Sequence, residues 1–240
     1  MKQEEFYKSS SAKDQPIRRI DKYEMAMDLI AQRKPKLFLD LGCGDGSFSQ
    51  ALKQATGMGT VFGIEIDKEA ALLAASKGIR VLNVNIDRQD LPFRKDVFEV
   101  IFCGELIEHL YDPDHLLQEI HRVMARDGIC ILTTPNLASW YNRIALLLGY
   151  QPFFTEVSTK YGVGYMLPFW LNAGHIRVFT LRAISELLKK HSFNIQKIRG
   201  CGINTGIGLG KKFSFFANLT NPISRIFPSL SSDLFIVFSK

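Results

Sequence analysis

The sequence has few cysteines and no long hydrophobic run. Its four cysteines lie far apart without a C-x-x-C spacing, at Cys43, Cys103, Cys130 and Cys201. No stretch approaches the ~18 consecutive apolar residues that a membrane-spanning helix requires. Residues 1–14 are polar and mixed in charge, so they have no apolar core of the kind that secretory signals carry. These absences predict a reduced, cytoplasmic protein.

Length and composition are those of an ordinary globular protein. The 240 residues suffice for one domain with a substantial core that needs neither disulfides nor metals, and 46% of them are hydrophobic. The net charge of +6 is moderate, and the basic residues are scattered rather than interleaved with aromatic residues in a stripe. A nucleic-acid partner is therefore not expected.

Residues 37–52, L-F-L-D-L-G-C-G-D-G-S-F-S-Q-A-L, organise the rest of the chain. A short apolar run predicts a buried strand, and the spacing of Phe48, Leu52 and the alanines near them predicts a helix. Three glycines in between, Gly42, Gly44 and Gly46, allow the backbone to approach a ligand closely. Asp40 and Asp45 add negative charge there, which favours a cationic or neutral nucleoside over a nucleotide triphosphate.

Acidic residues close the next two predicted strands. Glu65 follows a strand that begins at Val61 and stands 19 residues beyond Gly46, close to the spacing that places a carboxylate on a ribose. Asp87 follows a strand predicted over 79–85. The three strand ends are expected to form one ligand crevice.

These residues resemble the class I S-adenosylmethionine-dependent methyltransferases. The resemblance spans about 34–200 and rests on L-D-L-G-C-G-D-G, G-I-E-I-D, D-x-x-D-L-P-F, F-E-V-I-F, E-H-L and D-G-I-C-I-L-T-T-P-N, which occur in the family's order. It implies that the amino-acid end of the cofactor is held by Asp40, Gly42, Cys43, Gly44 and Gly46. Glu65, where the family more often has Asp, would take the ribose hydroxyls. Ile66 would flank the adenine, Asp87 and the Arg88 backbone would bind it, and Gly104 would also line the cofactor site.

Strands that alternate with helices predict an α/β, Rossmann-like, doubly wound and mostly parallel sheet. The resemblance implies seven strands with an antiparallel terminal hairpin. We expect a single methyltransferase domain over 1–240, with an N-terminal helix (16–33), a cofactor-binding half (34–135), a substrate lid (136–179), and a final part (180–240) with a helix, edge strands and an apolar insertion.

The predicted lid is rich in aromatic residues among glycines and prolines, which is typical of a substrate-binding loop. Asn136, Tyr165 and Trp170 are its candidate substrate contacts. Asn136 follows the fifth strand, where it either touches substrate or caps the next helix.

Glu105, Glu108 and His109 follow the fourth strand, and a helix there would place them at i, i+3 and i+4 on one face. Three interpretations remain open. Glu108 and His109 orient the segment under the cofactor, or His109 is a general base whose tautomer a glutamate fixes. In the third, Glu105, Glu108, His109 and His175, 66 residues further on, bind Mg²⁺, Mn²⁺ or Zn²⁺. This pattern is similar to that of small-RNA 2′-O-methyltransferases and ubiquinone-pathway O-methyltransferases, in which the ion lowers the pKa of the accepting hydroxyl.

Residues 211–230 are basic and aromatic, which is typical of a peripheral membrane contact. The alternative is an insertion packed on its own domain or in a dimer, since Pro222 and Pro228 interrupt any helix. Both monomer and homodimer are compatible with the sequence.

The favoured function is therefore O-methylation of a small hydroxylated acceptor of the sugar, quinol or secondary-metabolite type, with S-adenosylmethionine as cofactor and S-adenosylhomocysteine as product. A non-catalytic binding subunit and an RNA 2′-O-methyltransferase are alternatives. A nicotinamide-dependent oxidoreductase is another, but G-x-G-x-G lacks a glycine one place further on.

Overall fold

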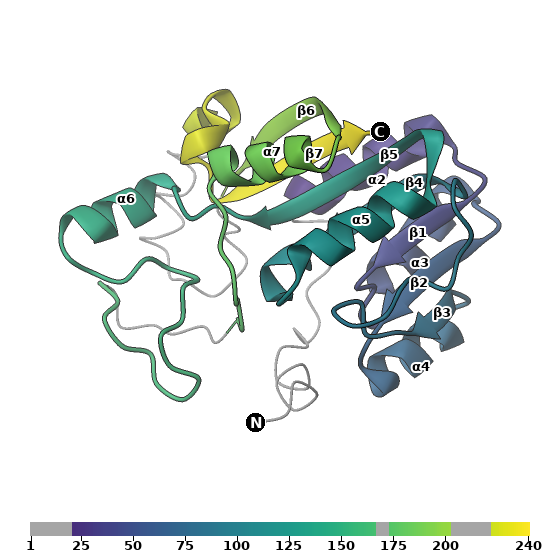
Figure 1. The fold of residues 1–240 in the computed structure, drawn as a ribbon, viewed down its shortest axis with the longest axis horizontal. Coiled ribbons are helices and arrows are strands. Elements are labelled where there is room, and N and C mark those ends of the chain that lie inside the picture. Colours follow the sequence, from purple (N-terminus) through teal and green to yellow (C-terminus); the bar gives the residue numbers. More distant parts are fainter. Residues whose placement is uncertain (1–20, 167–172, 203–221) are drawn as a thin grey trace.

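The computed structural model describes residues 21–166, 173–202 and 222–240. Within these residues, seven strands form one sheet in the order β3-β2-β1-β4-β5-β7-β6 (Figure 1). The first five strands in this order run parallel, and β7 runs antiparallel between β5 and β6. Their bounds are β1 Phe38–Leu41, β2 Val61–Glu65, β3 Arg80–Asn83, β4 Phe98–Gly104, β5 Met124–Pro135, β6 Asn194–Cys201 and β7 Asp233–Ser239. The predicted mostly parallel sheet with an antiparallel terminal hairpin is confirmed.

Helices connect the strands and begin where short polar side chains cap them. Asp67, Asp112 and Thr180 each accept a hydrogen bond from the backbone N–H three residues later, at 2.8, 2.9 and 3.1 Å. The helices are α2 Asp21–Arg33, α3 Ser47–Thr56, α4 Lys68–Ser76, α5 Pro113–Val123, α6 Trp140–Leu147 and α7 Leu181–Lys190, with short 3₁₀ turns η2 Ile107–His109 and η3 Pro228–Leu230. A further helix covers 222–226.

Two hydrophobic clusters cover the two faces of the sheet. Leu39 and Leu41 of β1 pack on the face that α5 and α7 cover, whereas Phe38 packs on the face of α2, α3 and α4. Because neighbouring strand residues point to opposite faces, both sides of β1 must be apolar. The continuous hydrophobic run before the glycines follows from this burial.

Strand β5 is longer than its sequence suggests. An Asp-Gly pair is typical of a turn, but Asp127 and Gly128 lie within β5, where the register against β4 shifts between the pairs Phe98–Met124 and Val100–Ile129. The extra residues form an irregularity in one long strand instead of a separate turn. Residues 16–20 of the predicted N-terminal helix and 211–221 of the predicted insertion lie outside the described residues.

The parallel strands β1, β2 and β4 all end at the same edge of the sheet. Gly42, Glu65 and Glu105 lie at or just after these ends. None of the helices among residues 21–166, 173–202 and 222–240 combines the length and apolarity that crossing a bilayer requires.

Candidate functional site

The glycine loop after β1 is bound to the neighbouring strand and leaves one glycine facing open space. The N–H groups of Gly42 and Cys43 both donate to the Ile64 carbonyl of β2, at 2.9 and 3.0 Å. Gly42, Gly44 and Gly46 have φ values of 71°, 54° and 76°, which L side chains rarely adopt. A side chain added at Gly44 would meet no other atom of the described residues within 4 Å, whereas one at Gly46 would lie 2.7 Å from Ala74. Gly46 therefore serves helix packing, and Gly44 is the position at which a ligand can approach.

Two buried carboxylates lie beneath this loop. The Glu65 carboxylate accepts hydrogen bonds from the N–H groups of Gly44 at 2.8 Å and Asp67 at 2.9 Å. Asp40 accepts one from the Ser49 hydroxyl at 2.6 Å, and burial raises its pKa to about 7. A cation bound nearby would compensate the cost of keeping Asp40 ionised. The loop and its two acids therefore fit the positively charged sulfur nucleoside that the sequence predicts.

The remaining predicted cofactor residues lie at or after the carboxyl ends of strands β2, β3 and β4. Ile66 directly follows Glu65 and is half-buried, Arg88 is exposed, and Gly104 ends β4. The Cys43 side chain points into the protein, because a side chain at Gly63 would meet its sulfur at 2.6 Å. Cys43 can therefore contribute to the site through its backbone alone.

Asp87 joins the third strand end to the start of α5. Its Oδ1 accepts hydrogen bonds from the N–H groups of Tyr111 and Asp112, at 2.9 and 3.1 Å. The following loop is held by the Arg122 guanidinium, which donates to the carbonyls of Phe93 at 2.6 Å and Leu91 at 2.8 Å. The segment predicted to bind adenine is thus fixed from two sides.

Glu108, His109 and His175 come together in one cluster. One potential ligand atom from each lies within 4.8 Å of the others. Glu108 is fully buried, its Oε2 accepts from the Thr134 hydroxyl at 2.9 Å, and its Oε1 has no hydrogen-bond partner in the described part of the chain. The Glu108 carbonyl accepts from Ile176 N at 2.8 Å, which ties the segment around His175 to η2. Burial, and then Glu105, raise the pKa of Glu108 well above its usual range.

Hydrogen bonds to backbone carbonyls assign the tautomers of the two histidines. Nδ1 of His109 lies 3.1 Å from the Gly174 carbonyl, and Nδ1 of His175 lies 3.0 Å from the Phe154 carbonyl. A carbonyl only accepts, so each Nδ1 carries the proton and each Nε2 has the lone pair. Burial, and then the neighbouring His175, lower the pKa of His109 to about 4, so His109 is neutral at physiological pH.

Glu105 does not join this cluster, and the helix predicted for it is not formed. Its φ of 51° is incompatible with a helix, and only the single turn η2 follows. Its carboxylate instead forms an ion pair with Lys22 at 2.6 Å and accepts from the Thr133 hydroxyl at 2.9 Å. Burial alone would raise the pKa of Glu105, but Lys22 and Thr133 together lower it.

Lys22 and Asp233 are site residues that the sequence analysis missed. The Lys22 ammonium lies 2.8 Å from Asp233 Oδ1 as well as next to Glu105, with 11% of its side chain exposed. Lys22 lies on an amphipathic helix and Asp233 at a strand start, positions where charges are ordinarily solvated. No local pattern identifies them, because residues more than 80 positions apart form the network.

The three candidate substrate residues are Asn136, Tyr165 and Trp170, of which the first two lie in different surroundings. The buried Asn136 side chain donates to the Ser231 carbonyl at 2.9 Å and accepts from Ala138 N at 3.0 Å, so it braces the chain around η3. Tyr165 stacks on Phe153 with ring centroids 6.0 Å apart and donates its hydroxyl to a backbone carbonyl. Trp170 lies outside the described residues.

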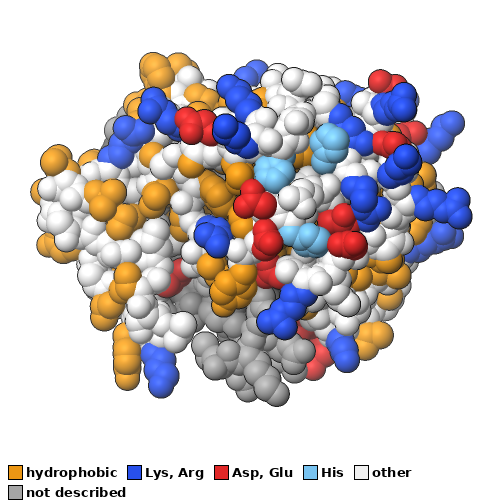
Figure 2. Space-filling view, viewed as in Figure 1, with side chains coloured by type: hydrophobic (Ala, Val, Ile, Leu, Met, Phe, Trp, Pro, Cys, Tyr) orange, Lys and Arg blue, Asp and Glu red, His pale blue; other side chains and the backbone are white. Residues whose placement is uncertain are grey.

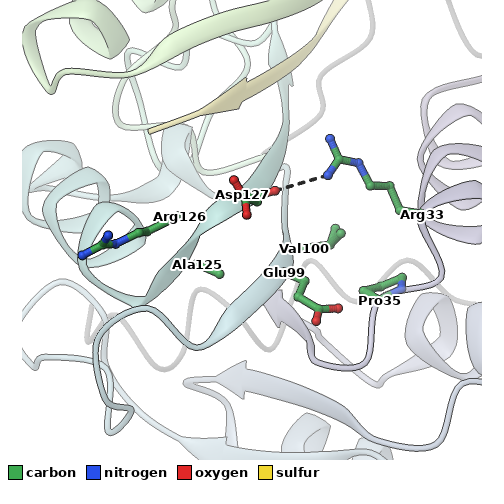
Figure 3. A pocket seen from close by; sticks show the side chains of 7 residues that line it. All are labelled: Arg33, Pro35, Glu99, Val100, Ala125, Arg126 and Asp127. Atoms are coloured by element: carbon green, nitrogen blue, oxygen red, sulfur yellow. Dashed lines mark hydrogen bonds between the residues drawn. The ribbon is translucent and has the colours of Figure 1, made fainter.

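A separate cavity of about 380 Å³ lies at the opposite end of β4 (Figure 3). Arg33, Glu99, Arg126 and Asp127 contribute charged groups to its lining, and Arg33 donates to the Asp127 carbonyl at 3.3 Å. Glu99 and Val100 belong to the start of β4, whereas the glycine loop and the histidine cluster lie near its end. This cavity is therefore not part of the site.

Comparisons with known proteins agree with this geometry. A family model described as a methyltransferase domain matches residues 17–198, more than half of the chain. Ubiquinone biosynthesis O-methyltransferase of Saccharomyces cerevisiae is 28% identical over 162 residues, 62% of this chain and 52% of that protein. Mitochondrial arginine-hydroxylase NDUFAF5 of Mus musculus is 28% identical over 109 residues, 45% of this chain and 30% of that protein. The chain thus spans about a third to half of the length of these curated relatives.

Solved structures share the whole fold. A chain in the complex between the Haloferax volcanii Trm112 methyltransferase activator and a putative methyltransferase superposes with a TM-score of 0.64 at 16% identity, over 99% of this chain and 97% of that one. The match to the family model, together with the glycine loop and the acids at the strand ends, settles the family. The chain belongs to the class I S-adenosylmethionine-dependent methyltransferases.

Proposed function

We propose that this methyltransferase acts on a hydroxyl oxygen of a small acceptor, and that Glu108, His109 and His175 hold a divalent cation beside it. The observation that carries the proposal is the arrangement of the two imidazoles. Both Nδ1 atoms donate to carbonyls, so in each ring the lone pair is on Nε2, and one potential ligand atom from each of Glu108, His109 and His175 lies within 4.8 Å of the others. Metal-binding histidines are characteristically oriented in this way by their second ring nitrogen.

The unpaired oxygen of Glu108 supports the same conclusion. A buried carboxylate oxygen without a partner is costly, and a bound cation would compensate it. Two imidazoles and one carboxylate suit Zn²⁺ or Mn²⁺ in particular, and Mg²⁺ through the carboxylate. A bound ion would supply a Lewis acid that lowers the pKa of the acceptor hydroxyl. Because Lys22 neutralises Glu105, we leave Glu105 out of the proposed ligand set.

General-base catalysis by His109 is less well supported. A pKa of about 4 makes His109 a weak base at neutral pH, far from the value near the working pH that favours proton transfer. The carbonyl of Gly174, rather than a carboxylate, binds its Nδ1. The hydrogen bond of His109 Nδ1 thus goes to a neutral carbonyl, which stabilises an imidazolium less than a carboxylate would.

The protein's own residues would align the reactants. Methyl transfer from a sulfonium is a direct displacement, so the rate depends on positioning and on exclusion of water. Asp40 and Glu65 complement the positive charge of the cofactor from below the glycine loop. Phe154, whose ring centroid lies 5.9 Å from that of His175, brings an aromatic side chain next to the histidine cluster, which suits a ring-shaped acceptor such as a quinol or a sugar.

A metal titration of two matched variants tests the proposal. Mn²⁺ or Zn²⁺ binding is measured by calorimetry in the wild type, Glu108→Gln and Glu105→Gln. We expect Glu108→Gln to weaken binding by more than about 100-fold, since loss of outer-shell partners alone costs about 10–100-fold. Glu105→Gln should leave metal affinity within about tenfold of the wild type. Equal affinities in all three proteins, or methyl transfer that survives exhaustive chelation, would contradict the metal proposal.

A second candidate is hydroxylation by a bound iron. Two histidines and one carboxylate form the ligand set of non-haem iron oxygenases, and one group of relatives is named arginine-hydroxylase. Mass spectrometry of the product separates the two activities. Methylation adds the mass of a methylene group, whereas hydroxylation adds that of an oxygen atom and requires O₂ and a reductant.

A further inference from the structure

Glu156 is the only charged residue between Arg143 and Lys160, in the loop that follows α6. Figure 2 shows mainly hydrophobic and uncharged side chains at the end of the molecule that α6 forms in Figure 1. One carboxylate oxygen of Glu156, Oε1, accepts a hydrogen bond from the N–H of Ala173 at 3.0 Å. The other, Oε2, is buried and has no hydrogen-bond partner among the described residues. A buried carboxylate oxygen without a partner opposes folding, so stability does not explain why an acid stands here.

The residue that Glu156 holds lies directly before the two groups that arrange the imidazoles. Gly174 follows Ala173, and its carbonyl accepts the hydrogen bond from Nδ1 of His109 at 3.1 Å. His175 comes next and provides the second imidazole of the cluster. Gly174 has a φ of 74°, and a glycine has no side chain that would restrict its backbone. The direction of its carbonyl therefore depends on the hydrogen bonds that hold its neighbours.

The loop that carries Glu156 is itself fixed. Asn142 of α6 binds both backbone groups of Phe153, accepting from its N–H at 2.7 Å and donating to its carbonyl at 3.3 Å. The next carbonyl, that of Phe154, accepts from Nδ1 of His175 at 3.0 Å. Glu156 adds a second hydrogen bond between the loop and the segment that contains His175. The loop is thus a support anchored to α6, and Glu156 fixes the start of that segment against it.

We propose that Glu156 is a positioning residue that fixes both imidazoles of the histidine cluster through Ala173. Its Oε1 sets the place of the Ala173 N–H, which sets the direction of the Gly174 carbonyl and, through it, the ring of His109. Partners of this kind, one step removed from the metal, are what orient metal-binding histidines. The effect on metal binding rests on the proposed function, whereas the orientation of the rings does not.

Two substitutions separate the hydrogen bond of Glu156 from its charge. In Glu156→Gln, the amide oxygen can still accept from Ala173, whereas Glu156→Ala leaves no acceptor. Calorimetry with Mn²⁺ should show an affinity about 10- to 100-fold weaker in Glu156→Ala, the usual cost of losing such a partner. Glu156→Gln should stay near the wild-type affinity. Glu186→Ala, on the exposed side of α7, is the matched control and should bind Mn²⁺ as the wild type does.

The imidazole tautomers of the metal-free protein give a second readout. Long-range ¹H–¹⁵N spectra should show the proton on Nδ1 of both His109 and His175 in the wild type. Glu156→Ala should move part of the His109 population to the tautomer with the proton on Nε2, because Nδ1 loses its acceptor. Glu156→Gln should restore the wild-type spectrum. The affinity for S-adenosylhomocysteine should be the same in all these proteins, since the glycine loop is held by other segments.

Three results would overturn the proposal. The first is a wild-type His109 tautomer together with wild-type Mn²⁺ affinity in Glu156→Ala. The second is failure of Glu156→Gln to recover, which would show that the charge and not the hydrogen bond matters. The third is a parallel loss of S-adenosylhomocysteine affinity or of the circular dichroism signal, which would assign Glu156 a general structural role. If the wild type binds no Mn²⁺, the metal proposal fails, and the His109 tautomers alone decide the role of Glu156.

Discussion

Replacing Lys22 by Met should reveal how strongly the buried charge network stabilises the fold. The Lys22 ammonium lies 2.6 Å from Glu105 and 2.8 Å from Asp233, with 11% of its side chain exposed. Removing one partner of a buried ion pair leaves the other charge uncompensated and costs about 3–5 kcal/mol. For a protein of this size, about 1 kcal/mol corresponds to about 2–4 °C in melting temperature. We therefore expect Lys22→Met to lower the melting temperature by about 6–20 °C at neutral pH.

The stabilisation that Lys22 provides depends on pH. Lys22 lowers the pKa of Glu105 against the opposing effect of burial, so this stabilisation is present above the ordinary carboxyl pKa. It is lost as the pH falls and Glu105 takes up a proton. The difference between Lys22→Met and the wild type should therefore shrink in acid. Urea unfolding followed by circular dichroism at several pH values measures it.

Two further variants define the control and the rescue. Lys68→Met changes an exposed lysine at the start of α4 and should alter the free energy of unfolding by less than about 0.5 kcal/mol. Lys22→Met/Glu105→Gln removes one of the stranded carboxylates and should recover part of the loss. The prediction is refuted if Lys22→Met lowers the free energy of unfolding by less than about 1 kcal/mol, or if it lowers it by the same amount at every pH.

Three other predictions concern the cofactor side of the site. Burial raises the pKa of Asp40 to about 7, and a bound sulfonium favours the ionised carboxylate. The affinity for S-adenosylmethionine, measured by calorimetry, should therefore rise about tenfold as the pH increases from one unit below that pKa to one unit above it. Asp40→Asn should abolish this dependence, and an unchanged pH profile would contradict it. Glu65→Gln should weaken S-adenosylhomocysteine binding by about 10- to 100-fold, while Glu186→Gln on the exposed side of α7 serves as the unaffected control. Arg122→Met leaves the carbonyls of Phe93 and Leu91 without the hydrogen bonds that the guanidinium donates. The free energy of unfolding, measured in urea, should fall by about 1–3 kcal/mol. A loss near zero would show that water replaces the guanidinium as donor.

Local patterns in the sequence account for the sheet and the cofactor loop. The apolar run before Gly42 predicts a strand buried on both faces, and Asp112 and Thr180 are residue types that favour the first position before a helix, where the structure has them. Each of these features depends on residues within a few positions of one another. Steric, hydrogen-bonding and hydrophobic preferences of short segments therefore make them recognisable in the sequence.

The arrangement of Glu105, Glu108 and the two histidines depends on contacts between distant segments. The pattern E-x-x-E-H suggested one helical face, but the backbone of Glu105 donates to the Thr133 carbonyl, and a positive φ turns its side chain to Lys22. His175 meets Glu108 because backbone hydrogen bonds from Ile176 and Arg177 to the Glu108 carbonyl join the two segments across 68 and 69 positions. Neither the ion pair nor the histidine tautomers leave a local signal.

The sequence by itself thus determined that this chain binds a sulfur nucleoside on a parallel sheet. Only the tertiary structure decided which carboxylate is neutralised by an ammonium and which remains beside the imidazoles. The physical reason is that burial and ion pairing set the charge of an acidic side chain, and both are properties of the packed protein rather than of neighbouring residues.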